Sequence, residues 1–105
     1  MISEAQVEKA LEYIRDNAAE YARLVGLCAA LDHKRKVIRS QAFLAASGTV
    51  AEREAHAETT LEYRAVIDEI QDAGTEKALI STHMKRAHLI CDVWRSQNAT
   101  QRMGL

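Results

Sequence analysis

The chain contains no proline, and along its first half nothing typical of a helix end occurs before Ser47-Gly48. Proline interrupts the hydrogen bonding of a helix, and a glycine just after the last turn commonly ends one. Alanine, leucine, glutamate, glutamine and arginine, which favour the helical conformation, are frequent in between. We therefore expect an all-α protein built from long helices.

A first helix is predicted over residues 3–46. Ser3 and Gln6 form a capping-box pattern, in which each side chain binds the backbone N–H of the other residue. Apolar residues then recur at alternating spacings of four and three, which places them on one helix face. This stripe consists of Val7, Leu11, Ile14, Ala18, Tyr21, Val25 and Cys28, and is continued by Leu24, Leu31, Ile38, Ala42 and Ala45.

A short second helix is predicted over 50–56 and a long third helix over 60–102. Thr49 and Glu52 form another capping-box pattern, and Thr59 or Thr60 is expected to cap the third helix. Gly74 lies inside the third helix as the site of a close helix contact, of a local bend, or of a tolerated weak point. The stripe of the third helix comprises Tyr63, Val66, Ile70, Ala73, Lys77, Ile80, Met84, Ala87, Cys91, Trp94 and Asn98.

The distribution of charge favours packing the two long helices against each other in antiparallel orientation. A turn near residue 52 places the basic run 34–39 opposite the acidic stretch 62–72, and the acidic N-terminal residues opposite Arg95 and Arg102. A parallel arrangement would oppose like charges. We expect a coiled-coil-like helical hairpin forming a single domain, 1–105. Because each helix of such a hairpin can bury only one side, we expect a homo-oligomeric bundle, in the first instance a dimer.

Net charge, hydrophobicity and cysteine spacing argue against a generally basic nucleic-acid binder, a secreted or membrane-spanning protein and a disulfide-linked one. The formal net charge is −1, so the whole chain exerts no general attraction on nucleic acid. The N-terminal residues lack the basic and apolar regions of a signal peptide, and no apolar run reaches the roughly 20 residues that span a bilayer. Cys28 and Cys91 have no metal-type spacing, and the predicted register places them too far apart for a disulfide. We expect a cytoplasmic protein without membrane association.

Two basic stretches are candidates for contact with nucleic acid or with a protein partner. The first contains Lys34, Arg35, Lys36 and Arg39, and the second contributes Lys85 and Arg86. Clustered cations bind phosphates, and the first run would do so on DNA or RNA. The alternative is a solvated helix face, in the first case neutralised by the acidic segment opposite. Neither stretch contains the aromatic side chains that usually alternate with cations in nucleic-acid grooves.

Trp94 and Tyr13 are candidate interface anchors. Together with Leu11 and Ile90 they are predicted to close the open end of the hairpin. Large aromatic side chains also anchor protein interfaces, so both an internal core and a partner contact fit this pattern.

The sequence offers no catalytic, cofactor-binding or metal-binding residues. His83 and His88 are five residues apart, whereas ligands on one helix face are three or four apart. No serine has the glycine-rich turn or the histidine and acid partners of a nucleophile. We expect a protein that is not an enzyme.

Four segments carry a resemblance to known sequences, namely 10–16, 51–55, 62–63 and 93–99. Taken in this order, they resemble a group of short, uncharacterised helical proteins of tailed bacteriophages and prophages. The resemblance covers nearly the whole chain, although the turn of that group contains proline and residues 57–60 have none. It implies a phage origin and a setting among genes for DNA recombination or replication, and it implies no catalytic residues.

These observations predict a non-enzymatic helical accessory protein. Its expected partners are a second copy and a phage or host protein of DNA metabolism, in the host cytoplasm. Direct nucleic-acid binding through the 33–39 run is one alternative, and a structural coiled-coil component of a larger assembly is another.

Overall fold

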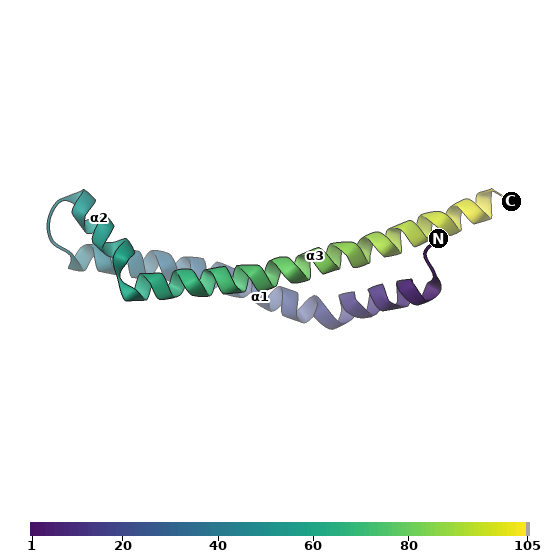
Figure 1. Cartoon of the computed structure of the whole chain (residues 1–105), viewed down its shortest axis with the longest axis horizontal. Helices are drawn as coiled ribbons and strands as arrows, with labels where there is room; N and C mark the ends of the chain where they lie inside the picture. The colour runs from purple at the N-terminus through teal and green to yellow at the C-terminus, as the bar shows by residue number, and fades with distance from the viewer. Residues whose placement is uncertain (105) are drawn as a thin grey trace. The chain divides into compact units, whose positions relative to one another are not determined.

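The computed structural model describes residues 1–104 and contains three helices, α1 (Glu4–Ala45), α2 (Val50–Thr59) and α3 (Leu61–Met103) (Figure 1). Within this part of the chain no strand occurs, which confirms the prediction of an all-α protein. The bounds of α1 and α3 lie within one residue of those predicted. The predicted end of the second helix is wrong, because α2 continues to Thr59 instead of ending near residue 56.

The helix starts follow the capping patterns of the sequence. Ser3 N donates to Gln6 Oε1 at 2.8 Å and Gln6 N donates to Ser3 Oγ at 3.2 Å. Thr49 Oγ1 accepts from Glu52 N at 3.2 Å and caps α2. Such side chains satisfy N–H groups that have no partner inside the helix.

Thr60 alone separates α2 from α3. Its backbone is extended, and its hydroxyl accepts from Tyr63 N at 3.2 Å while donating to Ala57 O at 3.3 Å. One side chain therefore closes the end of α2 and caps the start of α3. This is why α2 extends further than predicted, since no additional linker residues are needed.

The residues group into two compact units, each of which is described by itself. Unit 1 consists of Met1–Ala22 with α3 from Lys77 onward, and unit 2 of Arg23–Glu76. In unit 1, Ile2 N donates to Gln97 Oε1 at 3.2 Å and Tyr13 lies against His83, so α1 and α3 are antiparallel. The same orientation in unit 2 brings Lys34 to Glu69. These contacts confirm the predicted antiparallel helical hairpin.

The core of unit 1 is a seam of small side chains. Val7 and Ala10 on α1 pack with Ala87 and Cys91 on α3, and each is at most 7% exposed. Alanine opposite alanine lets the two helix backbones approach closely. Around this seam lie partly buried larger side chains, namely Ile2, Tyr13, Ile14, Ile90 and Trp94.

Unit 2 has a second core, formed by Leu31, Val66 and Ala73 with four partly buried neighbours. Leu24 and Ala57 are also fully buried. The guanidinium of Arg53 on α2 lies 4.4 Å from the centre of the Phe43 ring, which attaches α2 to the end of α1.

The predicted stripe of α3 is confirmed, because all eleven of its positions are buried or half-buried. The stripe of α1 is partly wrong, since Leu11, Ala18, Val25 and Ala45 are exposed. Position 10 occupies the seam instead of position 11, because the seam accepts the small Ala10 opposite Ala87. Four polar residues of α1 are also half-buried, namely Asn17, Glu20, Arg35 and Arg39. Asn17 is half-buried and donates from Nδ2 to Tyr13 O at 2.9 Å, and Arg35 is half-buried beside Asp32.

Candidate functional site

The basic run of α1 lies in unit 2, where its cations contact carboxylates. Lys34 Nζ lies 3.5 Å from Glu69 Oε1 on α3, as predicted for an acidic segment opposite the run. Arg39 Nε lies 3.2 Å from Glu58 Oε1. Glu58 belongs to the last turn of α2, beyond the end predicted for this helix. Both contacts join α1 to another helix of the same unit.

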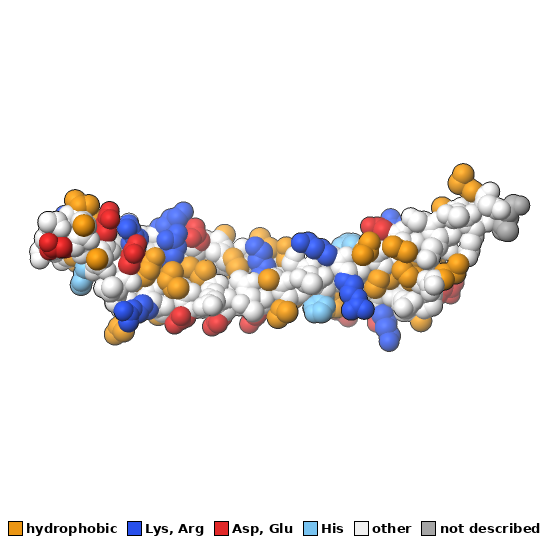
Figure 2. Space-filling model, turned by 45° about the horizontal axis from the view of Figure 1, so that its top comes forward, with side chains coloured by type: hydrophobic (Ala, Val, Ile, Leu, Met, Phe, Trp, Pro, Cys, Tyr) orange, Lys and Arg blue, Asp and Glu red, His pale blue; other side chains and the backbone are white. Residues whose placement is uncertain are grey.

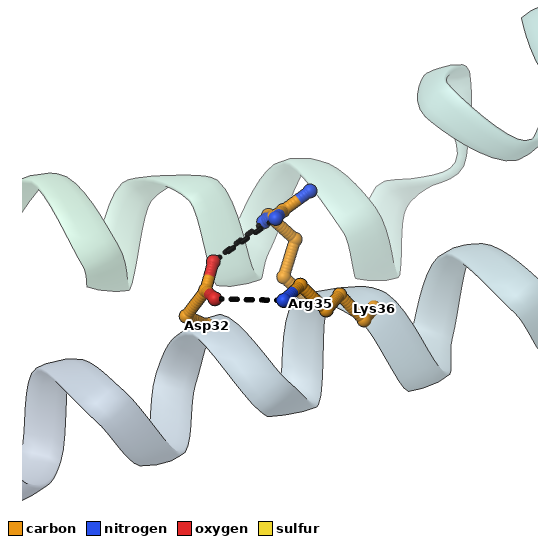
Figure 3. Close-up of polar contacts among 3 residues, drawn as sticks. All are labelled: Asp32, Arg35 and Lys36. Atoms are coloured by element: carbon orange, nitrogen blue, oxygen red, sulfur yellow. Dashed lines mark hydrogen bonds and ion pairs between the residues drawn. The ribbon is translucent and has the colours of Figure 1, made fainter.

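The other two cations share Asp32, one turn earlier on α1 (Figure 3). Arg35 Nη2 lies 3.0 Å and Lys36 Nζ lies 3.3 Å from its two carboxylate oxygens. The hydrogen bonds from Arg35 and Lys36, with the charge of Lys36, lower the pKa of Asp32 below its ordinary value. The hydrogen bonds to Asp32 and Tyr63 in turn raise the pKa of Arg35.

Pairing leaves the basic run with little free charge. Its four cations meet three carboxylates, those of Asp32, Glu58 and Glu69. These pairs are exposed to solvent, where an ion pair contributes little to stability, so a stronger anion could displace them. Any phosphate bound here would have to compete with carboxylates that are already in place.

The second basic stretch lies in unit 1. Lys85 and Arg86 are both exposed on α3, but of the two only Arg86 lines a groove between α1 and α3. We call this the Tyr13 groove. No aspartate or glutamate is among its lining residues, which are Gln6, Lys9, Ala10 and Tyr13 from α1 and His83, Arg86, Ala87 and Ile90 from α3.

The two aromatic rings of the groove are in direct contact. The ring centroids of Tyr13 and His83 are 5.8 Å apart and the ring planes meet at 62°, an edge-to-face arrangement. Buried Ala10 and Ala87 lie beside them. This combination is not visible within the basic stretch of the sequence, because Tyr13 comes from the other helix. The signal was the antiparallel register, which brings the start of α1 to the end of α3.

Trp94 lies near the same core but outside the groove. It is half-buried and packs against the core of unit 1, as Ile2, Tyr13 and Ile90 also do. Leu11, predicted to join them, is 54% exposed, for the reason given above for the α1 stripe. Arg95, predicted to face the acidic N-terminal residues, instead pairs with Asp92 on its own helix at 3.3 Å.

Other chemistry is sparse in residues 1–104. No group of three or more histidine, cysteine or acidic side chains is placed to hold a metal ion there. Cys28 is half-buried and Cys91 buried, and both are free thiols. Over the same residues no helix combines the length and hydrophobicity needed to cross a membrane.

Much of the visible surface is chemically mixed. Figure 2 shows lysine, arginine and histidine side chains next to hydrophobic ones, with acidic side chains interspersed. Leu11, Leu79 and Leu89 of unit 1 are each more than half exposed, as are Leu44, Val50 and Leu61 of unit 2.

Comparison of the chain with protein-family models, with curated proteins and with solved structures finds no match.

Proposed function

We propose that this chain is a non-enzymatic helical accessory protein that acts by packing its helices against other proteins, first of all against a second copy of itself. The resemblance to small phage proteins supports a role in phage DNA recombination or replication. The partner beyond the second copy is then a phage or host protein of DNA metabolism, and the setting is the host cytoplasm.

The observation that carries the proposal is an uncharged outer surface of α1 in unit 2. Residues 25–30 span more than one helical turn and include no charged side chain. Four of them are exposed, namely Val25, Gly26, Ala29 and Ala30. A Cβ added at Gly26 would meet nothing within 4 Å, so no contact within residues 1–104 requires a glycine here. Small side chains allow a second helix to approach closely.

A second copy fits this surface because the surface has no charge to repel itself. In a two-fold dimer the same patch meets its own image, so a charged patch would oppose like charges. Val25 is 42% exposed and would gain a contact on dimerisation.

Size-exclusion chromatography with light scattering tests the dimer at micromolar concentration. The unmodified chain is expected to elute as a dimer. Val25→Glu combined with Ala29→Glu should give a monomer of unchanged helicity, because four added carboxylates, two from each copy, would then meet in the dimer interface. The matched control is Ser40→Glu with Gln41→Glu, at two exposed positions of the same helix ten or more residues beyond the patch, which should remain dimeric. A strictly monomeric unmodified chain contradicts the self-association.

The accessory role is tested by affinity capture from infected cells with a tagged chain. A recombination or replication protein should be recovered with the unmodified chain. Recovery only with assembled particles would instead favour the structural coiled-coil alternative.

A further inference from the structure

We propose that the Tyr13 groove of unit 1 binds single-stranded nucleic acid, with Lys9 and Arg86 on backbone phosphates and the Tyr13–His83 pair against a base. The proposal does not depend on dimerisation, since every residue that lines the groove lies in unit 1 of one chain.

Charge distinguishes this groove from the basic run 34–39. In the run each cation already has a carboxylate within 3.5 Å. Within residues 1–104 neither Lys9 nor Arg86 has an ion-pair partner, and the groove lining contains no carboxylate. A phosphate entering between them displaces only water. The weaker basic stretch in the sequence therefore supplies the more available cation.

The aromatic pair supplies what a phosphate site alone lacks. Bases stack on aromatic side chains with little regard to sequence, because every base has a flat π-face. Tyr13 is half-buried, and its contact with His83 holds both rings at the groove. The small side chains of Ala10 and Ala87 leave room beside the rings.

The combination favours a single strand over other anions. An acidic peptide would satisfy Lys9 and Arg86 but has no flat face for the rings. Duplex DNA keeps its bases stacked inside, and the net charge of −1 provides no broad cationic surface for it. A single strand presents phosphates and unstacked bases together.

The test is fluorescence anisotropy with a labelled oligothymidine. Its length is about 16 nucleotides, the upper site size of an OB fold that binds single strands. Binding is measured from about 50 mM to about 200 mM salt, because phosphate contacts are strongest at low salt. The groove variant is Lys9→Gln with Arg86→Gln. The matched control, Lys34→Gln with Lys36→Gln, removes the same charge from the paired run.

The groove variant should lower affinity about tenfold or more and reduce the slope of log affinity against log salt by about 1.4, or about 0.7 for each lost phosphate contact. The control should change affinity less than about twofold, since its cations already bind carboxylates. Tyr13→Leu, which keeps an apolar side chain at the core, should also lower affinity about fivefold or more while leaving the salt slope unchanged. Circular dichroism verifies that each variant is helical.

Three results would overturn the proposal. One is the absence of binding at about 50 mM salt. Another is an equal loss of affinity in the groove and control variants, which would indicate general charge attraction. The third is displacement of the oligonucleotide by polyglutamate at a lower concentration than by unlabelled oligothymidine, which would identify an acidic-peptide site. Light scattering on the groove variant should still report the oligomer of the unmodified chain, so the two proposals fail separately.

Discussion

The ring of Tyr13 on α1 meets the ring of His83 on α3 edge-on, with the two centroids 5.8 Å apart. Tyr13 also packs against the core of unit 1, in which Ala10 and Ala87 are buried. One aromatic side chain therefore contributes both to the core and to the groove surface. This contact fixes which residue of α3 faces the start of α1, because a shift of one residue would turn the ring away from the seam.

Replacing Tyr13 by alanine should destabilise the folded chain by about 1–3 kcal/mol, below the range for fully buried aromatics because Tyr13 is half-exposed. For a domain of this size each kcal/mol lowers the melting temperature by roughly 4–8 °C. Thermal unfolding followed by circular dichroism measures this shift.

The matched control is Leu11→Ala, two residues earlier on α1. Leu11 is 54% exposed, and the change should cost less than about 0.5 kcal/mol, as is usual for surface substitutions. If the leucine variant melted as low as the tyrosine variant, position 11 would belong to the seam and the observed register would be wrong.

The sharing of Asp32 by Arg35 and Lys36 predicts a pH-dependent contribution to stability. The pKa of Asp32 is lowered from its ordinary value of 3.8, so the folded chain binds its proton less tightly than the unfolded chain. The contribution is therefore fully present above about pH 5 and is lost as the pH falls through the folded pKa. Asp32→Asn should lower the melting temperature near neutral pH and have little effect in strong acid.

The cause of this pH dependence can be separated by a double-mutant cycle. In a Lys36→Gln background, Asp32→Asn should have a smaller effect at neutral pH, because one of the two ion pairs is already gone. High salt should reduce the effect in both backgrounds, since the pairs are exposed. An effect of Asp32→Asn that is the same at every pH would mean that the loss comes from packing or propensity instead.

The sequence was sufficient to locate α3 and its buried face because the spacing of three and four is unbroken from Tyr63 to Asn98, and each of these positions is buried or half-buried. Leu79 and Leu89 are hydrophobic but do not fit this spacing, and both are exposed. On α1 the pattern offered two candidates at several steps, such as Ala10 or Leu11. Hydrophobicity favours leucine, but the seam accepts the smaller residue because an alanine faces it. That preference depends on the opposing helix and cannot be read from α1 alone.

The candidate site was less predictable because its parts come from distant segments. The cations of the run were predicted to face the acidic stretch of the third helix, and Lys34 does contact Glu69. Arg39 pairs with Glu58, a residue beyond the predicted end of the second helix. The Tyr13 groove requires the pairing of Tyr13 with His83, which the charge pattern locates only to within several residues.

Gly74 and Gly48 differ in whether the structure leaves room for a side chain. Gly74 lies within helical α3, and a Cβ there would meet nothing within 4 Å. Among the interpretations of Gly74 from the sequence, a close helix contact within the chain is therefore wrong, and a tolerated weak point fits. Gly48 has φ +108°, and a Cβ there would press on the Glu52 carboxylate.

Gly74→Ala should stabilise the chain by about 1 kcal/mol, because alanine loses less backbone freedom on entering a helix and has open space here. Gly48→Ala should destabilise it by about 1–3 kcal/mol, since L-residues rarely adopt that backbone conformation. The same substitution thus moves the urea midpoint in opposite directions at the two positions. A lower midpoint for Gly74→Ala would mean that another molecule occupies the space beside residue 74, because nothing in residues 1–104 lies within 4 Å of a methyl group placed there.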